Sequence, residues 1–266
     1  MSTWRLGSVT INTSSTSTAI LSSGVSTSRD IATLATAGDP TTALRILNRV
    51  LHNVRIATHD LTLVTALACV DLTLFFRQTD SCGGVSGTWI SLAVSNAMVW
   101  PDSISASGRS PATLNIRAIP FSSDGSTAPF TVGSTSGSTT AETDAWQIET
   151  TNVTDFSVDF GYRVQTISEP TRYVTTEGAF VTEHMPTMSA TINAASEITQ
   201  AKLDADACAT LTVALTKAAA CGGTTGADRT YALTGLFGLD DLSAAGRGPG
   251  ACRVTVFGDN TGLSVT

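Results

Sequence analysis

The side chains that most often carry catalysis are few in this sequence, and they are not grouped as such chemistry requires. His52 and His59 are separated by seven positions and His184 is remote from both. A metalloprotease or a serine hydrolase would show HExxH or GxSxG, and neither occurs; in GSTSG (133–137) a threonine takes the nucleophile's place. The runs GGVSG and GRGPG lack the lysine and the spacing of a phosphate-binding loop. We therefore expect no catalytic residue and no cofactor.

The cysteines show a regular spacing that could serve redox chemistry or metal binding. Cys69 and Cys82 are 13 positions apart, and so are Cys208 and Cys221. Metal binding would call for CxxC-like clusters, which are missing, so we expect no metal site. Each pair could form a disulfide, or the pairs could be equivalent buried strand positions of a duplicated sequence. We favour the second interpretation, because the N-terminus does not resemble a signal peptide and disulfides are rare in reducing compartments.

A ten-residue motif occurs twice, as DSISASGRSP (102–111) and DDLSAAGRGP (240–249). The identical positions are Asp102/Asp240, Ser105/Ser243, Ala106/Ala244, Gly108/Gly246, Arg109/Arg247 and Pro111/Pro249. We interpret the motif as a structural connector that precedes a strand. In it Ile104 and Leu242 anchor in a core, the glycine adopts an angle that other residues avoid, the proline blocks a helix, and the arginine pairs with the motif's aspartate or with a neighbouring subunit.

The repetition extends beyond this motif. The second cysteine of each pair is followed by Gly-Gly, and the offset between the copies is 139 at the cysteines and 138 at the Gly-Arg motif. Trp4 and Trp146 open the two halves. An internal duplication follows, which predicts two domains at 1–138 and 139–266, joined through the Ser/Thr/Gly-rich segment 133–144.

Strands dominate the predicted secondary structure. Alternating or β-branched runs predict them at 4–12, 49–58, 70–78, 88–95, 112–121, 155–167, 171–178, 188–193, 209–216, 229–238 and 252–258. One short helix is expected in each half, at 59–68 and at 196–207. The predicted fold is mainly β: two tandem similar β-sandwich or barrel domains, each flanked by one short helix.

The low content of charged residues is compatible with a surface that is buried in an assembly. Only 14% of the 266 residues are charged, which leaves a single chain prone to self-association. The net charge is −7 and there are two lysines, so tight binding of nucleic acid is not expected. No apolar run is long enough to predict a transmembrane helix.

The chain resembles phage tail tube proteins. The resemblance rests on the order of strands, turns and a short helix in 150–198, on the hairpin 213–235 and the closing strand 253–262, and on a similar plan in 49–67 and 114–125. It implies a structural virion protein whose rings stack into a tube through which the genome passes. A duplicated tube domain implies rings of three chains with pseudo-sixfold symmetry; a ring of six chains is the alternative.

The resemblance also implies partners and a location. The chain would contact copies of itself, other tail proteins and passing DNA without binding that DNA specifically, and no membrane. It would be assembled in the host cytoplasm and end in the virion tail. Segment 13–28 is expected to become ordered only when rings stack.

Three other interpretations remain open. One is a different virion component, such as a capsid decoration protein, a tail terminator or a fibre segment. Another is a carbohydrate-binding β-sandwich, although only 6% of the residues are aromatic. The third is an enzyme.

Overall fold

The protein is described from a computed structural model, which defines residues 3–12, 15–35, 43–79, 85–108, 110–122, 124, 127–139, 145–167, 178–193, 208–218, 224–243 and 250–266. Within these ranges the chain is mainly β and contains no helix. The strands are β1 (Thr3–Ile11), β2 (Ser15–Ser17), β3 (Ile20–Ala35), β4 (Ala43–Thr58), β5 (Ala68–Thr79), β6 (Val85–Ser107), β7 (Thr113–Pro120), β8 (Thr131–Gly133), β9 (Ala145–Ile148), β10 (Val153–Asp159), β11 (Tyr162–Ile167), β12 (Gly178–His184), β13 (Thr187–Ile192), β14 (Cys208–Ala218), β15 (Thr224–Ser243) and β16 (Ala251–Val265).

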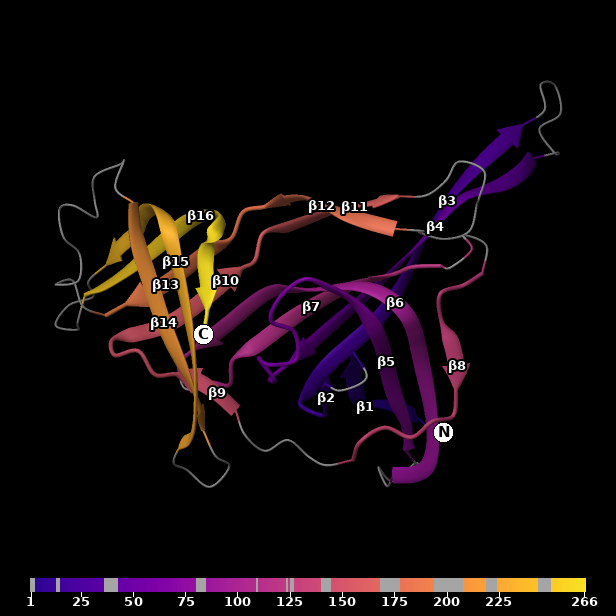
Figure 1. Cartoon of the computed structure of the whole chain (residues 1–266), viewed down its shortest axis with the longest axis horizontal. Coiled ribbons are helices and arrows are strands. Elements are labelled where there is room, and N and C mark those ends of the chain that lie inside the picture. Colours follow the sequence, from indigo (N-terminus) through magenta and orange to yellow (C-terminus); the bar gives the residue numbers. More distant parts are fainter. Residues whose placement is uncertain are drawn as a thin grey trace.

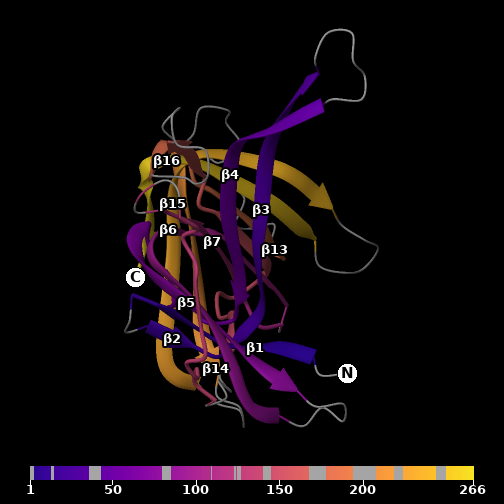
Figure 2. The same cartoon turned by 90° about the vertical axis from the view of Figure 1, so that its right-hand side faces the viewer.

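One antiparallel sheet of 14 strands runs through both halves of the chain. Its central order is β5-β6-β10-β13-β16-β15-β14, and β7, β4 and β3 branch from β6. β11 and β12 form a separate two-stranded sheet. Figures 1 and 2 both show the β3–β4 hairpin projecting beyond the rest of the molecule, whereas β11–β12 lies along the body near β6 and β7 in Figure 1.

Alternation along the strands builds the core. Phe156 and Val158 in β10 are buried while Asp155 and Asp159 are exposed, as the sequence pattern predicts for a strand with one face on a core. The main cluster of buried side chains includes Leu72 of the first half and Val213 and Tyr231 of the second. Apolar residues of both halves therefore pack into one core.

The structure does not support two separate domains. β6 of the first half pairs with β10 of the second, so the sheet passes from one half to the other without interruption. The boundary at 138/139 remains a prediction about sequence units.

The predicted helix at 59–68 is wrong. Residues 59–67 form turns and bends before β5 begins. Asp60 Oδ1 accepts a hydrogen bond from the Thr62 backbone N–H at 2.9 Å, which closes a local turn in competition with a helix. Leu61, Leu63 and Val64 are all buried in this loop. The second predicted helix, 196–207, lies outside the described residues.

The predicted strands overlap observed ones, except that 171–177 lie outside the described residues. In the described part of 13–28, residues 15–17 form β2 and 20–28 belong to β3, and the expectation that this segment becomes ordered only on stacking stays a prediction.

Candidate assembly interface

The two halves pair their strands in the same way. In the β5–β6 hairpin Leu72 faces Val94, and in the β14–β15 hairpin Leu211 faces Leu233, each 139 positions further on. Each hairpin also has an irregular step near its tip, between Arg77 and Thr79 in one and between Thr216 and Ala218 in the other. Bulges are specific features of a strand pair, so their coincidence favours a common plan for the two hairpins.

The change of offset from 139 to 138 has a structural location. Cys69 faces Met98, and Cys208 faces Leu236. The two cysteines are 139 positions apart in the sequence, whereas the residues that they face are 138 positions apart. The β5–β6 pair has a register shift between Val70 and Leu72 that the β14–β15 pair lacks. The extra residue of the first half is thus accommodated in a bulge.

The strand pairs that follow also correspond. Ile104 faces Leu114 in β6–β7, and Leu242 faces Cys252 in β15–β16, both shifted by 138. A bulge lies at the motif's aspartate in each pair: the shifts are between Pro101 and Ser103, and between Leu239 and Asp241.

The correspondence reaches regions where the sequences show no obvious similarity. Ile20 faces Thr58 in β3–β4, and Val153 faces Ile192 in β10–β13, with a register shift directly after each first residue. The next register shift follows Asp30 in β3 and Arg163 in β11. These two residues are 133 positions apart, as are Ile20 and Val153. β11–β12 is therefore the second-half equivalent of the outer β3–β4 hairpin.

The first strands of the two halves complete this pattern. Trp4 of β1 faces Gln78 of β5, and Trp146 of β9 faces Lys217 of β14. We call residues equivalent when they hold the same place in these matched strand pairs.

The halves meet at the β6–β10 junction, which we define as Ser103–Ser107 paired with Asp155–Asp159. Ile104 faces Val158 there, and their exposed fractions are 1% and 0%. The Phe160 N–H donates to the Asp102 carbonyl at 3.0 Å, and Ser107 Oγ donates to Asp155 Oδ1 at 2.6 Å. Backbone hydrogen bonds and a buried apolar pair therefore hold the halves together.

A second apolar contact adds to this junction. Met98, Trp100, Ile119 and Phe121 of the first half form a small buried cluster. Tyr162, Val164 and Ala179 of β11–β12 are packed against it. The second half thus contacts the first through a strand edge and through this hairpin.

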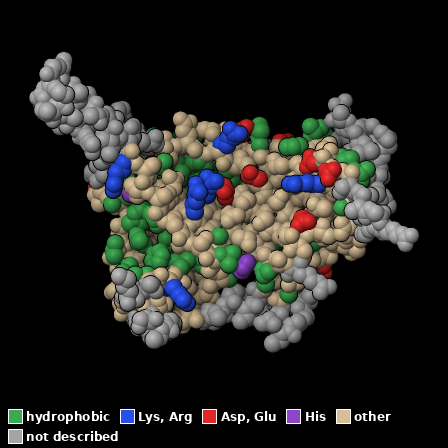
Figure 3. Space-filling view, turned by 180° about the vertical axis from the view of Figure 1, so that it is seen from behind, with side chains coloured by type: hydrophobic (Ala, Val, Ile, Leu, Met, Phe, Trp, Pro, Cys, Tyr) green, Lys and Arg blue, Asp and Glu red, His purple; other side chains and the backbone are tan. Residues whose placement is uncertain are grey.

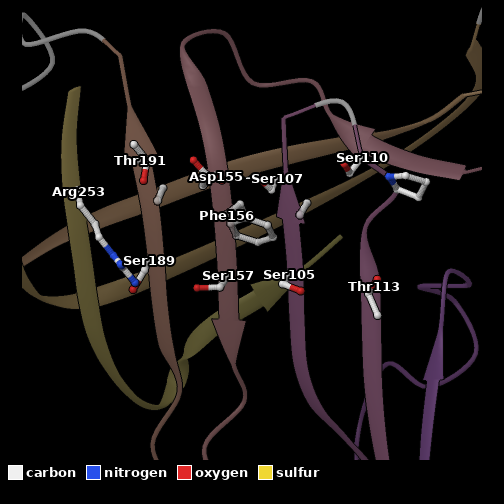
Figure 4. A pocket seen from close by; sticks show the side chains of 13 residues that line it. Ser105, Ser107, Ser110, Thr113, Asp155, Phe156, Ser157, Ser189, Thr191 and Arg253 are labelled. Carbon is white, nitrogen blue, oxygen red and sulfur yellow. Dashed lines mark hydrogen bonds between the residues drawn. The ribbon is translucent and has the colours of Figure 1, made fainter. Parts of the chain in front are cut away.

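The face of the junction opposite the core is polar. Figure 4 shows β16, β13, β10, β6 and β7 side by side, with Ser189, Ser157, Ser105 and Thr113 on adjacent strands and the Arg253 side chain extending toward Ser189. A hollow of about 500 Å³ lies over these strands. Its lining includes serines, threonines, Asp155 and Arg253, which offer hydrogen bonds.

The motif's aspartates have partners on this polar face. Asp102 forms an ion pair with Arg117 (2.9 Å). Asp240 accepts a hydrogen bond from Thr255 Oγ1 and lies 4.0 Å from Arg253. The predicted partners Arg109 and Arg247 lie outside the described residues. On the face in Figure 3, acidic and basic side chains are dispersed, and hydrophobic side chains gather on one side.

For the remaining motif residues, some expectations are confirmed and others are wrong, and some residues lie outside the described ranges. Gly108 has φ +55°, as expected, and follows the end of β6. Asp102 and Asp240 belong to strands, so the connector begins later than predicted. Ile104 is buried as expected, but the matching expectation for Leu242 is wrong because it is 59% exposed. Pro111 is exposed beside the hollow, whereas Gly246 and Pro249 lie outside the described residues.

The expectation of buried cysteines is also wrong. Cys69 and Cys208 are free and exposed strand residues. Alternation in β14 places Cys208 on the face opposite the buried Leu211 and Val213. Cys82 and Cys221 lie outside the described residues.

Within the described ranges, no group of three or more His, Cys, Asp or Glu side chains is arranged to hold a metal ion. Among the same residues, no helix is long and apolar enough to cross a membrane. Comparison of the chain with models of protein families gives no match, and comparison with curated proteins gives none either.

Sequence reasoning missed the β6–β10 junction. The signal available was weak: Ile20, Val25 and Ile31 have the same spacing as Val153, Val158 and Val164. Since the surrounding letters differ, only the strand registers make this correspondence plain.

Proposed function

We propose that this chain is the subunit of a phage tail tube, which assembles with copies of itself into stacked rings of three chains. The observation that carries the proposal is the repetition of strand pairing, with bulges at equivalent positions, between the two halves. A chain made of two equivalent units supplies six similar units to a ring of three. A separate decoration or sugar-binding role would not require this repetition.

The polar face supports a role as the wall of a channel. Eight strands form one continuous ribbon across the chain, in the order β3-β4-β7-β6-β10-β13-β16-β15. One face of this ribbon packs on the core. On the other face polar side chains line two hollows, beside the apolar Met98, Trp100 and Ile119 and the exposed Leu236 and Phe257. Among the described side chains of this face around the junction, there are five aspartates (Asp102, Asp155, Asp159, Asp240 and Asp241) and three arginines (Arg55, Arg117 and Arg253). Such a wall repels phosphates and lets DNA pass without being gripped.

Negative-stain electron microscopy over a concentration series, together with native mass spectrometry, tests the proposal. We expect rings and tubes whose smallest closed species has three times the chain mass of 27.4 kDa. Rings of six chains would keep the tube but remove the role given to the repetition. A single chain at every concentration would refute the proposal.

A further inference from the structure

The internal junction has an open counterpart at each end of the ribbon. The residues equivalent to Asp155–Asp159 of β10 lie in β3, and those equivalent to Ser103–Ser105 of β6 lie at the end of β15. Among the residues that the structure describes, β3 pairs only with β4, and residues 237–243 of β15 pair only with β16. Figure 1 shows β3 and β15 on opposite sides of the molecule, so they do not meet within one chain.

Side chains on the two open edges are apolar where the internal junction buries apolar groups. Val25 is equivalent to Val158, and Leu242 is equivalent to Ile104. Val25 and Leu242 are 37% and 59% exposed, whereas Val158 and Ile104 are 0% and 1% exposed. An open strand edge with an exposed apolar side chain is a surface that pairs with another strand.

The second contact of the internal junction also has an exposed counterpart. Leu236 and Phe257 are equivalent to Met98 and Ile119, which β11–β12 covers. Leu236 and Phe257 are 49% and 53% exposed. The hairpin equivalent to β11–β12 is the outer part of β3–β4, which projects from the body (Figures 1 and 2).

We propose that β3 of one copy pairs antiparallel with the end of β15 of a second copy, in the register that β10 and β6 use inside the chain. This register places Gly24 opposite Ser243, Val25 opposite Leu242 and Ser26 opposite Asp241. The outer β3–β4 hairpin of the same copy then covers Leu236 and Phe257 of its neighbour. The partner is a second copy because the chain already contains the matching junction.

This inference rests on the proposed function for the closure of the ring, but the strand pairing itself is independent of it. The contact is head-to-tail, so it closes into a ring only if the rotation per chain permits and otherwise gives an open filament. The eight-stranded ribbon of each chain continues into the next one in either case.

A cysteine pair at a non-hydrogen-bonded position reports the register. Inside the chain Phe160 and Asp102 form a hydrogen-bonded pair, so the next pair, Asp159 and Ser103, is of the closer, non-hydrogen-bonded type. Its equivalent is Ser26 with Asp241, both exposed. Side chains at such a pair are near enough for a disulfide.

In the experiment, the full chain carrying Ser26→Cys and Asp241→Cys is oxidised so that a disulfide can form between copies. Thr27→Cys with Asp241→Cys is the matched control, because a shift of one residue moves the side chain to the other face. The wild type, which has its own exposed Cys69 and Cys208, gives the background. Isotope-labelled and unlabelled chains are mixed, and the linked peptides are identified by mass spectrometry.

We expect covalent species up to three chains, in which residue 26 of one chain is linked to residue 241 of another. The control should give on the order of tenfold less of its own inter-chain link. Rings or tubes without the 26–241 link would overturn the proposed strand pairing but not the proposed tube. The link in open filaments would support the pairing and overturn the ring. Chains that neither link nor assemble would overturn both.

Discussion

Ile104 and Leu242 have the same place in two hairpins that share their register and bulge, yet only Ile104 is buried. The hairpins do not cause this difference, because β6 pairs with β7 in the same register as β15 pairs with β16. The cause is that β10 lies beside β6, whereas no described strand pairs with the corresponding edge of β15. Leu242 is therefore exposed because no described strand lies beside that edge, and not because its hairpin is folded differently.

The two outer hairpins differ in a related way. β3 runs without a break through Ser28, but the equivalent position in the second half is Gly161, between β10 and β11. Gly161 has φ +65°, and a Cβ there would collide with the Met185 carbonyl. This break accompanies the return of β11–β12 over the first half, while the continuous β3–β4 hairpin projects outward (Figure 1).

The largest effect we predict is loss of assembly by Val25→Asp. In the proposed junction this carboxylate would be buried against Leu242 without a partner, at a cost of about 3–5 kcal/mol per contact, or more than about a hundredfold in the dissociation constant. Val132→Asp is the matched control, since Val132 is 70% exposed and belongs to β8, away from both edges. Sedimentation velocity should show a folded single chain for Val25→Asp and wild-type assembly for Val132→Asp. Equal assembly of the two would contradict the junction.

The next effect compares equivalent side chains within the unassembled chain. In a Val25→Asp background, Ile104→Ala should lower the free energy of unfolding by about 2–5 kcal/mol, because it leaves a cavity in the core. Leu242→Ala should change it by about 0.5 kcal/mol or less, as for other exposed positions. Urea denaturation measures both. A large loss for Leu242→Ala would mean that its side chain is already covered within one chain.

The strand pairing could be predicted from the sequence where the two halves have the same residues. The cysteine spacing and the Gly-Arg motif predicted equivalent hairpins, and β5–β6 and β14–β15 pair as that requires. Alternation predicted the buried Phe156 and Val158. These are local signals, set by the period of a strand and the residues of a turn.

The rest depended on contacts between distant segments. The apolar pattern of 59–68 suited a helix, but Leu61, Leu63 and Val64 are buried by strands from elsewhere in the chain. The burial of Ile104 and the exposure of Leu242 depend on which strand lies beside each, which no local pattern encodes. A motif that is repeated in sequence can therefore have two environments.

A smaller difference between the halves concerns alkaline pH. Burial raises the pKa of Tyr231 to about 12, against the partial lowering by Arg229, and the equivalent residue in β6 is Leu92, which does not ionise. The stability gained by keeping this phenol neutral is present below pH 10 and is lost as the pH rises toward 12. Wild type should lose about 2–3 kcal/mol more than Tyr231→Phe over this interval. Urea titrations at several pH values test this, and parallel stability curves for the two proteins would contradict it.

The smallest effect concerns the hairpin that covers the first half. The His184 and Tyr162 rings are stacked with centroids 4.2 Å apart, and burial lowers the pKa of His184 below 6.5. Because the folded state favours the neutral ring, its contribution to stability is present above pH 6.5 and declines as the pH falls. We expect hydrogen exchange in β11–β12, corrected for intrinsic rates, to accelerate modestly between pH 7.5 and pH 5. His184→Phe keeps an aromatic ring without a titrating group and should remove this pH dependence; if the variant loosens as much as the wild type, the histidine is not the cause. Loosening here would uncover Met98 and Ile119 and make the first half resemble the second.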